Sequence, residues 1–128
     1  MSLALSARLK RVRADLLRAA RERTVVTYGE LMKRHGLSRG RRLSQTIGQV
    51  DRAEYAAKGP GFAAIVVRKD TGYPGGGYFC DDELPVVLRR PRQRASDPRL
   101  SPAEIRHVRE EQRRIWSHYG RPKTPKPS

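Results

Sequence analysis

The chain has 128 residues, which is enough for one domain and a tail. Its 28 Lys and Arg outnumber its 13 Asp and Glu, and the formal net charge of +15 attracts polyanions. A single cysteine, Cys80, excludes an intramolecular disulfide and a zinc site built from several cysteines, and the apolar runs are too short to span a membrane. We therefore expect a cytoplasmic protein whose partner is a nucleic acid and not a membrane.

The first predicted element is a helix over residues 3–22. Its apolar residues recur at steps of three and four, as in a helix with one buried face: Leu5, Leu9, Val12, Leu16 and Ala20. The β-branched run Thr24–Val26 then predicts a short edge strand.

A helix-turn-helix is predicted between residues 28 and 57. Thr27 can cap its first helix, because Glu30 stands three residues later and completes a capping box. That helix is predicted from Tyr28 to about His35, and Gly36 is the type of residue that ends a helix.

The second helix of the pair is predicted from Arg39 to Ala57, with Ser38 as its N-cap. Four residues are expected on its buried side: Leu43, Ile47, Val50 and Tyr55. Long polar side chains fall largely on the opposite side: Arg41, Arg42, Gln45, Gln49 and Arg52.

A hairpin with a glycine-rich tip is predicted next. Residues Phe62–Arg68 have the composition of a buried strand, Lys69–Gly77 is a turn-rich loop, and Tyr78–Phe79 offers a short return strand. Pro85–Leu88 is expected to form a further short strand or an extended segment.

The C-terminal third is predicted to hold one more helix. Residues 89–100 form a basic connector rich in Arg and Pro, and Ser101 with Glu104 marks a helix start that runs to about Tyr119. Its expected apolar face consists of Ile105, Val108, Ile115, Trp116 and Tyr119. We predict that this helix either packs on the domain or mediates a homodimer, and that residues 120–128 are a disordered basic tail.

This order of elements predicts an α+β fold, a winged helix-turn-helix with an N-terminal helix, a glycine-rich wing hairpin and an added C-terminal helix. The predicted units are a winged-helix domain (1–88), the connector (89–100), the C-terminal helix (101–119) and the tail (120–128). In such folds the second helix of the pair enters the major groove, and the wing lies over the backbone or in the minor groove.

The predicted nucleic-acid contacts follow from that placement. Arg and Gln are the residue types that pair with guanine and adenine edges. The candidates are Ser38, Arg39, Arg41, Arg42, Gln45, Gln49 and Arg52 on the helix, and Arg68, Lys69 and Tyr73 on the wing. The alternative is a basic helix face that is merely solvated, and the glycine run by itself is also typical of an ordinary hairpin loop.

Several short motifs resemble the DNA-binding domain of alkylguanine-DNA alkyltransferases and alkyltransferase-like proteins. They are Thr27–Leu31, Ile47–Gly48, Val66–Asp70 and Gly76–Tyr78, so the resemblance spans residues 24–79. It implies a winged helix, and it implies that Tyr28 contacts the phosphate beside a flipped nucleotide. It also implies an arginine finger, which alignment on Gly48 places at Gln45 and counting from Tyr28 places at Arg42.

The chain departs from that family at the nucleophile. The family carries Pro-Cys-His-Arg before the Val-Val pair, whereas this chain has Phe62–Ile65 there. Cys80 lies beyond the hairpin, with no histidine nearby in sequence to activate it. We therefore expect no catalytic residue, no metal and no cofactor. The acidic patch Asp81–Glu83 and the Glu104–His107 pair are expected to be surface charges, not metal ligands.

Three functions remain open at this point. The first is a non-catalytic protein that reads double-stranded DNA, associated with the nucleoid if the source is bacterial. The second is an interaction module on RNA or a ribonucleoprotein, in which the connector and tail thread between phosphates. The third is a small enzyme or enzyme subunit that uses Tyr28, His35 or the acidic patch.

Overall fold

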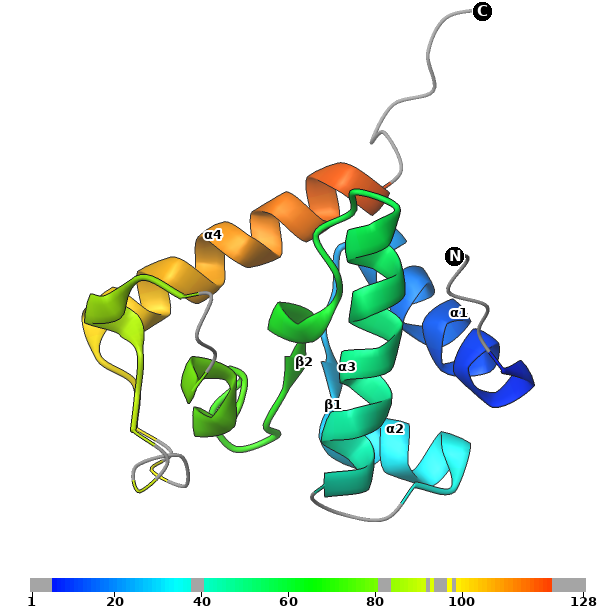
Figure 1. The fold of residues 1–128 in the computed structure, drawn as a ribbon, viewed down its shortest axis with the longest axis horizontal. Helices are drawn as coiled ribbons and strands as arrows, with labels where there is room; N and C mark the ends of the chain where they lie inside the picture. The colour runs from blue at the N-terminus through cyan, green and yellow to red at the C-terminus, as the bar shows by residue number, and fades with distance from the viewer. Residues whose placement is uncertain are drawn as a thin grey trace, which may run out of the picture.

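The computed structural model describes residues 6–37, 41–80, 84–91, 93, 97 and 99–120. In chain order its elements are α1 (Ala7–Arg21), β1 (Val26–Thr27), α2 (Tyr28–His35), α3 (Arg41–Ala56), the 3-10 helix η1 (Ala63–Ile65), β2 (Val66–Val67), the 3-10 helices η2 (Gly76–Cys80) and η3 (Val86–Leu88), and α4 (Pro102–Tyr119). In Figure 1 the two strands lie to one side of α3, α1 lies to its other side and α4 runs across one end.

Local capping defines the helix starts. The Thr27 hydroxyl accepts a hydrogen bond from the Glu30 backbone N–H, and the Glu30 carboxylate accepts one from the Thr27 backbone N–H, so the predicted capping box is confirmed. Gly36 ends α2 with a left-handed backbone conformation at φ 61°. Ser101 and Glu104 form the same box at the start of α4. Ser6 also caps α1 by accepting a hydrogen bond from the Leu9 N–H, so three of the four described α-helix starts follow from residues within one turn of the cap.

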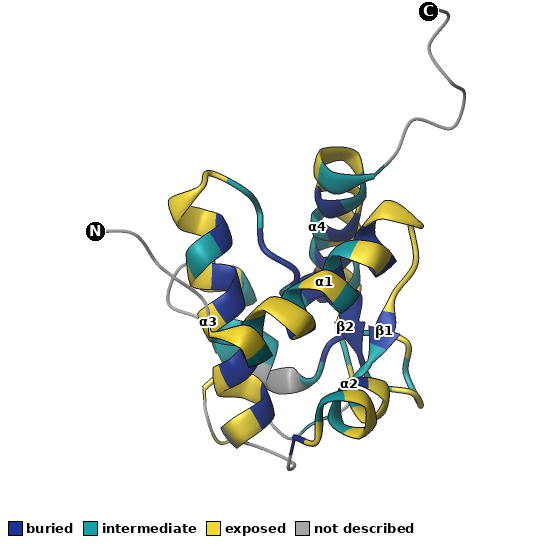
Figure 2. Cartoon of the chain, turned by 90° about the vertical axis from the view of Figure 1, so that its right-hand side faces the viewer, coloured by how far each residue is buried: buried dark blue, intermediate teal, exposed yellow. Residues whose placement is uncertain are grey.

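The core lies where α1, α3 and α4 meet the strands. The predicted stripe of α1 is confirmed over its described part, with Val12, Leu16 and Ala20 fully buried. Ile115 of α4 belongs to the same core, so α4 packs on the body of the protein. Figure 2 shows that α1 and α3 alternate buried and exposed residues, as expected for helices that each bury one face.

The predicted wing hairpin is not found in the described part of the chain. The strands β1 and β2 pair in parallel, with Val26 opposite Val66 and Thr27 opposite Val67. Phe62–Arg68 contributes only two residues to this sheet, and the expected return strand Tyr78–Phe79 lies in the 3-10 helix η2. A parallel pair cannot be closed by a tight turn, so the partner of β2 comes from far back in the sequence.

Two further predictions are wrong. Pro85–Leu88 is not extended, because Val86–Leu88 forms η3, closed by the Leu88 N–H bond to Pro85 O (2.8 Å). Tyr55 is not on the buried side of α3: it is 54% exposed, and its neighbour Glu54 is buried instead. Glu54 can be buried because Arg13 of α1 neutralises its carboxylate.

Candidate nucleic-acid interface

Four of the predicted reading residues form an exposed strip on α3. Arg42, Gln45, Gln49 and Arg52 are all exposed and follow one another at helical steps of three and four, so they share one side of the helix. We call these four residues the reading strip. The buried residues Leu43, Ile47 and Val50 hold the opposite side of α3 against the core, as predicted.

The remaining helix candidates are only partly described. Ser38 and Arg39 lie outside the described residues, and for Arg41 the structure describes the backbone as the first residue of α3 but not the side chain. Thr46 sits on the inner side of the same turn, where its hydroxyl donates to the Arg42 carbonyl at 2.8 Å. The described part of the strip therefore begins at Arg42.

The predicted wing residues lie in a short closed loop. The Arg68 N–H donates to Tyr73 O and the Gly72 N–H donates to Arg68 O, both at 2.9 Å. The Arg68 guanidinium pairs with both carboxylate oxygens of Asp70, at 2.9 and 2.6 Å, and this pairing lowers the pKa of Asp70. Lys69 is exposed at the turn. Because Asp70 neutralises Arg68, Lys69 is the more available cation of the two.

Two tyrosines fasten this loop to the helices. The Tyr73 hydroxyl accepts a hydrogen bond from Arg109 of α4 at 3.1 Å. The Tyr28 hydroxyl accepts one from the Gly75 N–H at 3.0 Å, and burial raises the pKa of Tyr28. Tyr28 and Tyr73 were both predicted to contact nucleic acid. In the structure each hydroxyl bonds to another part of the protein, so the two tyrosines position the loop.

Replacing Tyr28 with Phe tests that positioning role. The change leaves the Gly75 N–H without its acceptor, so we expect faster amide hydrogen exchange at Gly75 and a loss of about 1 kcal/mol in the free energy of unfolding. Tyr73→Phe is the matched control, since it removes the bond at the other end of the loop. Unchanged exchange at Gly75 in Tyr28→Phe would contradict the assignment.

A groove opens beside the reading strip, between α3 and α4. It encloses about 790 Å³, and Arg52 of the strip lies on its rim. Its α3 wall includes Ser44 and Gly48, its floor includes Ala63 and Ala64 of η1, and its far walls come from α4, Tyr78, Leu84 and Pro85. We call it the α3–α4 groove. A Cβ added to Gly48 would meet no atom within 4 Å, so the groove is open to that position.

Buried polar contacts that the sequence analysis missed hold this groove in shape. The Asp51 carboxylate accepts from the Phe62 N–H at 2.7 Å and the Ala63 N–H at 3.2 Å, which fixes the turn into η1. Burial raises the pKa of Asp51 to about 6, against the lowering effect of these two bonds. Gly61 approaches the same carboxylate so closely, at φ 79°, that a side chain there would collide with it.

A second buried carboxylate joins three helices. Glu54 of α3 accepts two bonds from the Arg13 guanidinium of α1, at 2.8 and 3.2 Å, and one from the Tyr119 hydroxyl of α4 at 2.8 Å. Burial alone would raise the pKa of Glu54, but these partners outweigh it and the pKa is lowered. The Tyr119 ring stacks on Phe62 with centroids 4.7 Å apart. The signal was present in the sequence, because Glu54 continues the spacing of Ile47 and Val50.

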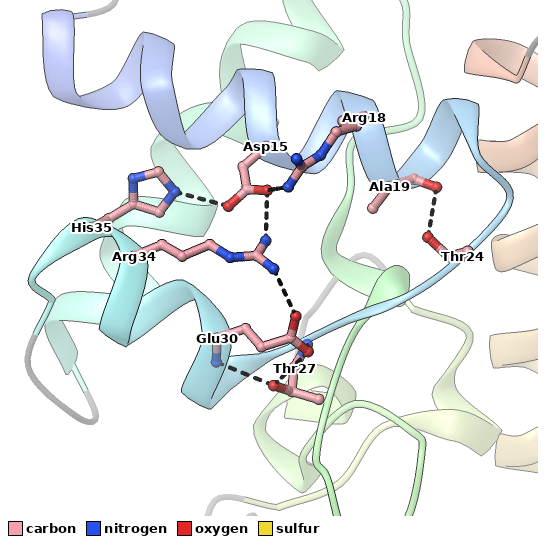
Figure 3. A network of polar contacts seen from close by, with 8 residues as sticks. All are labelled: Asp15, Arg18, Ala19, Thr24, Thr27, Glu30, Arg34 and His35. Atoms are coloured by element: carbon pink, nitrogen blue, oxygen red, sulfur yellow. Dashed lines mark hydrogen bonds and ion pairs between the residues drawn. The ribbon is translucent and has the colours of Figure 1, made fainter.

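A third network joins α1 to α2 (Figure 3). The Asp15 carboxylate bonds to His35 Nε2 at 3.0 Å, to Arg34 at 2.8 Å and to Arg18 at 2.7 Å. Burial opposes the charge on Asp15, yet these bonds lower its pKa overall. Arg34 also reaches Glu30, so the capping box of α2 is tied to α1. This network fixes the first helix of the predicted helix-turn-helix.

The connector supplies a structural arginine. Arg90 is buried, with its side chain 3% exposed, and it forms a bidentate pair with Glu104 at 2.6 and 2.9 Å. Its guanidinium also donates to the carbonyls of Asp97 and Arg99 and lies 5.2 Å from the Phe79 ring centroid. Arg90 therefore fastens the connector to the start of α4 and is not available to phosphates. The expectation that Glu104 is a surface charge is wrong, because this pairing buries its carboxylate.

Other site types find no support among the described residues. No three His, Cys, Asp or Glu side chains of that part of the chain gather as a metal site, and the predicted acidic patch Asp81–Glu83 lies outside it. None of the described helices is long and apolar enough to cross a membrane. Comparison with family models, with curated proteins and with solved structures finds no match for this chain.

Proposed function

We propose that the protein binds double-stranded DNA through the reading strip of α3, without catalysing a reaction. The observation that carries the proposal is the strip itself: two arginines and two glutamines, all exposed, on one side of a helix whose other side is anchored in the core. These side chains match the hydrogen-bonding patterns of guanine and adenine edges in the major groove. The net charge of +15 supplies the sequence-independent attraction to phosphates.

In this proposal α2 and α3 act as a helix-turn-helix, as in the alkyltransferase DNA-binding domains that residues 24–79 resemble. The closed loop of residues 68–75 takes the place of a wing, with Lys69 as its phosphate contact. Tyr28 and Arg109 support the loop from behind. The strip keeps Gln45 and Arg42 exposed, so either can serve as the residue that enters the base stack.

Alanine substitution in the strip tests the proposal. Arg42→Ala and Gln49→Ala should each weaken binding to a preferred duplex by about 1–3 kcal/mol, and Arg42→Ala should also reduce the slope of log affinity against log salt by about 1 if it contacts a phosphate. Arg113→Ala on the exposed side of α4 is the matched control and should change the affinity far less.

Salt titrations of duplex DNA, single-stranded DNA and structured RNA should be run in parallel with these variants. The proposal requires tighter binding to the duplex and loss of that preference in the strip variants. Equal affinity for all three polyanions, with the strip variants and Arg113→Ala equally affected, would rule it out and favour a general polyanion or RNA role.

A further inference from the structure

The outer side of α1 carries a row of exposed basic side chains: Lys10, Arg11, Arg18 and Arg21. At about 100° per residue, these four positions fall within an arc of about 100° on the helix. The fully buried residues Val12 and Leu16 lie on the opposite side, against the core. We call the four cations the basic stripe. In Figure 2, α1 lies toward the viewer and exposed residues run along it.

Contacts on the other sides of α1 keep the basic stripe facing solvent. Arg13 bonds to Glu54 of α3 at 2.8 and 3.2 Å, and Asp15 bonds to His35 of α2 at 3.0 Å. Arg8 also donates to the His35 carbonyl at 3.3 Å. These contacts fix the rotation of α1, so the helix presents its cations in a set arrangement. Such pre-organisation lowers the entropy cost of binding a ligand.

The basic stripe holds more positive charge than its neighbours neutralise. Asp15 pairs with Arg18 at 2.7 Å but shares its carboxylate with α2, and Glu22 is exposed at the C-terminal end of the helix. The other three cations of the stripe form no ion pair among the described residues. Even with both carboxylates counted in full, a net positive charge remains. The outer side of α4, by contrast, mixes its arginines with Glu110.

A hollow of about 290 Å³ opens on the same side of α1. It is lined by Ala14, Leu17, Arg18, Arg21 and Glu22. Ala14 stands one turn before Arg18 and two turns before Arg21, and its short side chain leaves space beside both arginines. Two guanidinium groups against one carboxylate make this hollow suited to a small oxyanion such as a phosphate group.

The chemistry of the basic stripe favours phosphates over base edges. Lys and Arg offer only hydrogen-bond donors, so their ligand must supply acceptors and negative charge. The stripe lacks the Gln side chains with which the reading strip can both donate to and accept from adenine. It extends over about 16 Å, and the phosphates of one DNA strand follow at about 3.4 Å along the duplex axis. A membrane-surface helix inserts its apolar face, whereas α1 buries that face in the core.

We propose that the basic stripe is a second contact surface for double-stranded DNA, which binds the phosphate backbone regardless of base sequence. Phosphate contacts of this kind supply affinity and position a protein without carrying sequence information. In this arrangement the reading strip of α3 selects the sequence and the basic stripe adds affinity. The inference rests on the proposed function, since it takes duplex DNA as the ligand.

The triple variant Lys10→Gln/Arg11→Gln/Arg21→Gln tests the stripe in the full-length protein. It leaves Arg18 with its partner Asp15, and Gln is a good helix former, so α1 should still fold. The slope of log affinity against log salt should fall by about 2 to 3 for duplex DNA, since each phosphate contact contributes about 0.9. The preference for a duplex that the parent selects from a random-sequence pool, over a scrambled duplex, should stay at the parental value.

A matched control separates the stripe from net charge. Arg99→Gln/Arg106→Gln/Arg113→Gln removes the same number of exposed cations from the connector and α4, and it should change the slope by less than about 1. Thermal unfolding checks that both triple variants are folded. Equal slopes for the two triple variants would overturn the proposal. A stripe variant that loses the preference for the selected duplex would also overturn it, because the stripe would then take part in reading bases.

Two further comparisons assign the surface. Loss of binding to vesicles of phosphatidylcholine and phosphatidylserine, with parental duplex affinity in the stripe variant, would replace the proposal with an anionic membrane surface. If Arg42→Ala and Gln49→Ala bind duplex DNA as the parent does while the stripe variant has a reduced slope, the reading function of α3 fails and the basic stripe stands. The opposite pattern removes the basic stripe and leaves the reading strip.

Discussion

Arg90→Met should lower the free energy of unfolding by about 3–5 kcal/mol. The substitution keeps much of the side-chain volume but leaves the Glu104 carboxylate buried without its cation, and loss of one partner of a buried ion pair has a cost of that order. It also removes the bonds to the Asp97 and Arg99 carbonyls. Urea unfolding followed by circular dichroism measures the change.

The control for this prediction comes from the same connector. Arg99→Met makes the same substitution at a side chain that is 89% exposed, so it should change stability by less than about 0.5 kcal/mol. Arg90→Lys keeps a charge but cannot form the bidentate pair, and it should fall between the two. A loss in Arg90→Met no greater than that in Arg99→Met would show that the buried pair does not hold α4.

Asp51→Asn should remove a fall in stability that the parent protein shows between about pH 4 and pH 7. Burial raises the pKa of Asp51 in the folded state to about 6, against an ordinary value near 3.8. The folded state therefore binds more protons than the unfolded state in this window, so the free energy of unfolding decreases as the pH rises. A shift of about two pKa units corresponds to about 3 kcal/mol.

The difference between parent and variant isolates this effect. Asp15, Glu54 and Glu104 have lowered pKa values and act with the opposite sign, since their contribution is lost as the pH falls toward 4 and below. All three are present in both proteins; Asp15 and Glu104 cancel in the comparison, whereas Glu54 interacts electrostatically with Asp51 and contributes to its raised pKa. Asp70→Asn, at the exposed turn, should keep the parental profile above pH 5. Parallel curves for the parent and Asp51→Asn would contradict the prediction.

Features governed by nearest neighbours could be predicted from the sequence. The capping boxes of Thr27 and Ser101 and the stop at Gly36 depend on residues within one turn. The stripe of Val12, Leu16 and Ala20 follows from helical periodicity alone. The exposed position of the reading strip follows from the same periodicity, because the strip lies opposite the buried residues of α3.

Features that depend on residues far apart in the sequence could not be predicted from it. Val66 forms a strand pair with Val26, forty positions away, so its local pattern predicted a hairpin that the glycine-rich segment does not form. Tyr55 was expected on the buried side of α3, although Glu54 continues the helical spacing of Ile47 and Val50; nothing near Glu54 in sequence reveals Arg13 and Tyr119 as the partners of its carboxylate. Arg90 was one connector arginine among several, and only its position beside Glu104 separates it from the others. Burial of a charged side chain beside its partner can be recognised only from the tertiary structure.

The dependence of the core on α4 has a consequence for synthesis. The Trp116 indole donates to the Thr24 carbonyl at 3.0 Å, across 92 positions of the chain, and Gln112 reaches the Ala64 carbonyl. A nascent chain leaves the ribosome N-terminus first, so the parts of α1 and η1 that α4 covers stay exposed until the end of α4 has cleared the exit tunnel. We expect the high net positive charge of the chain to oppose association of neighbouring nascent chains during that interval.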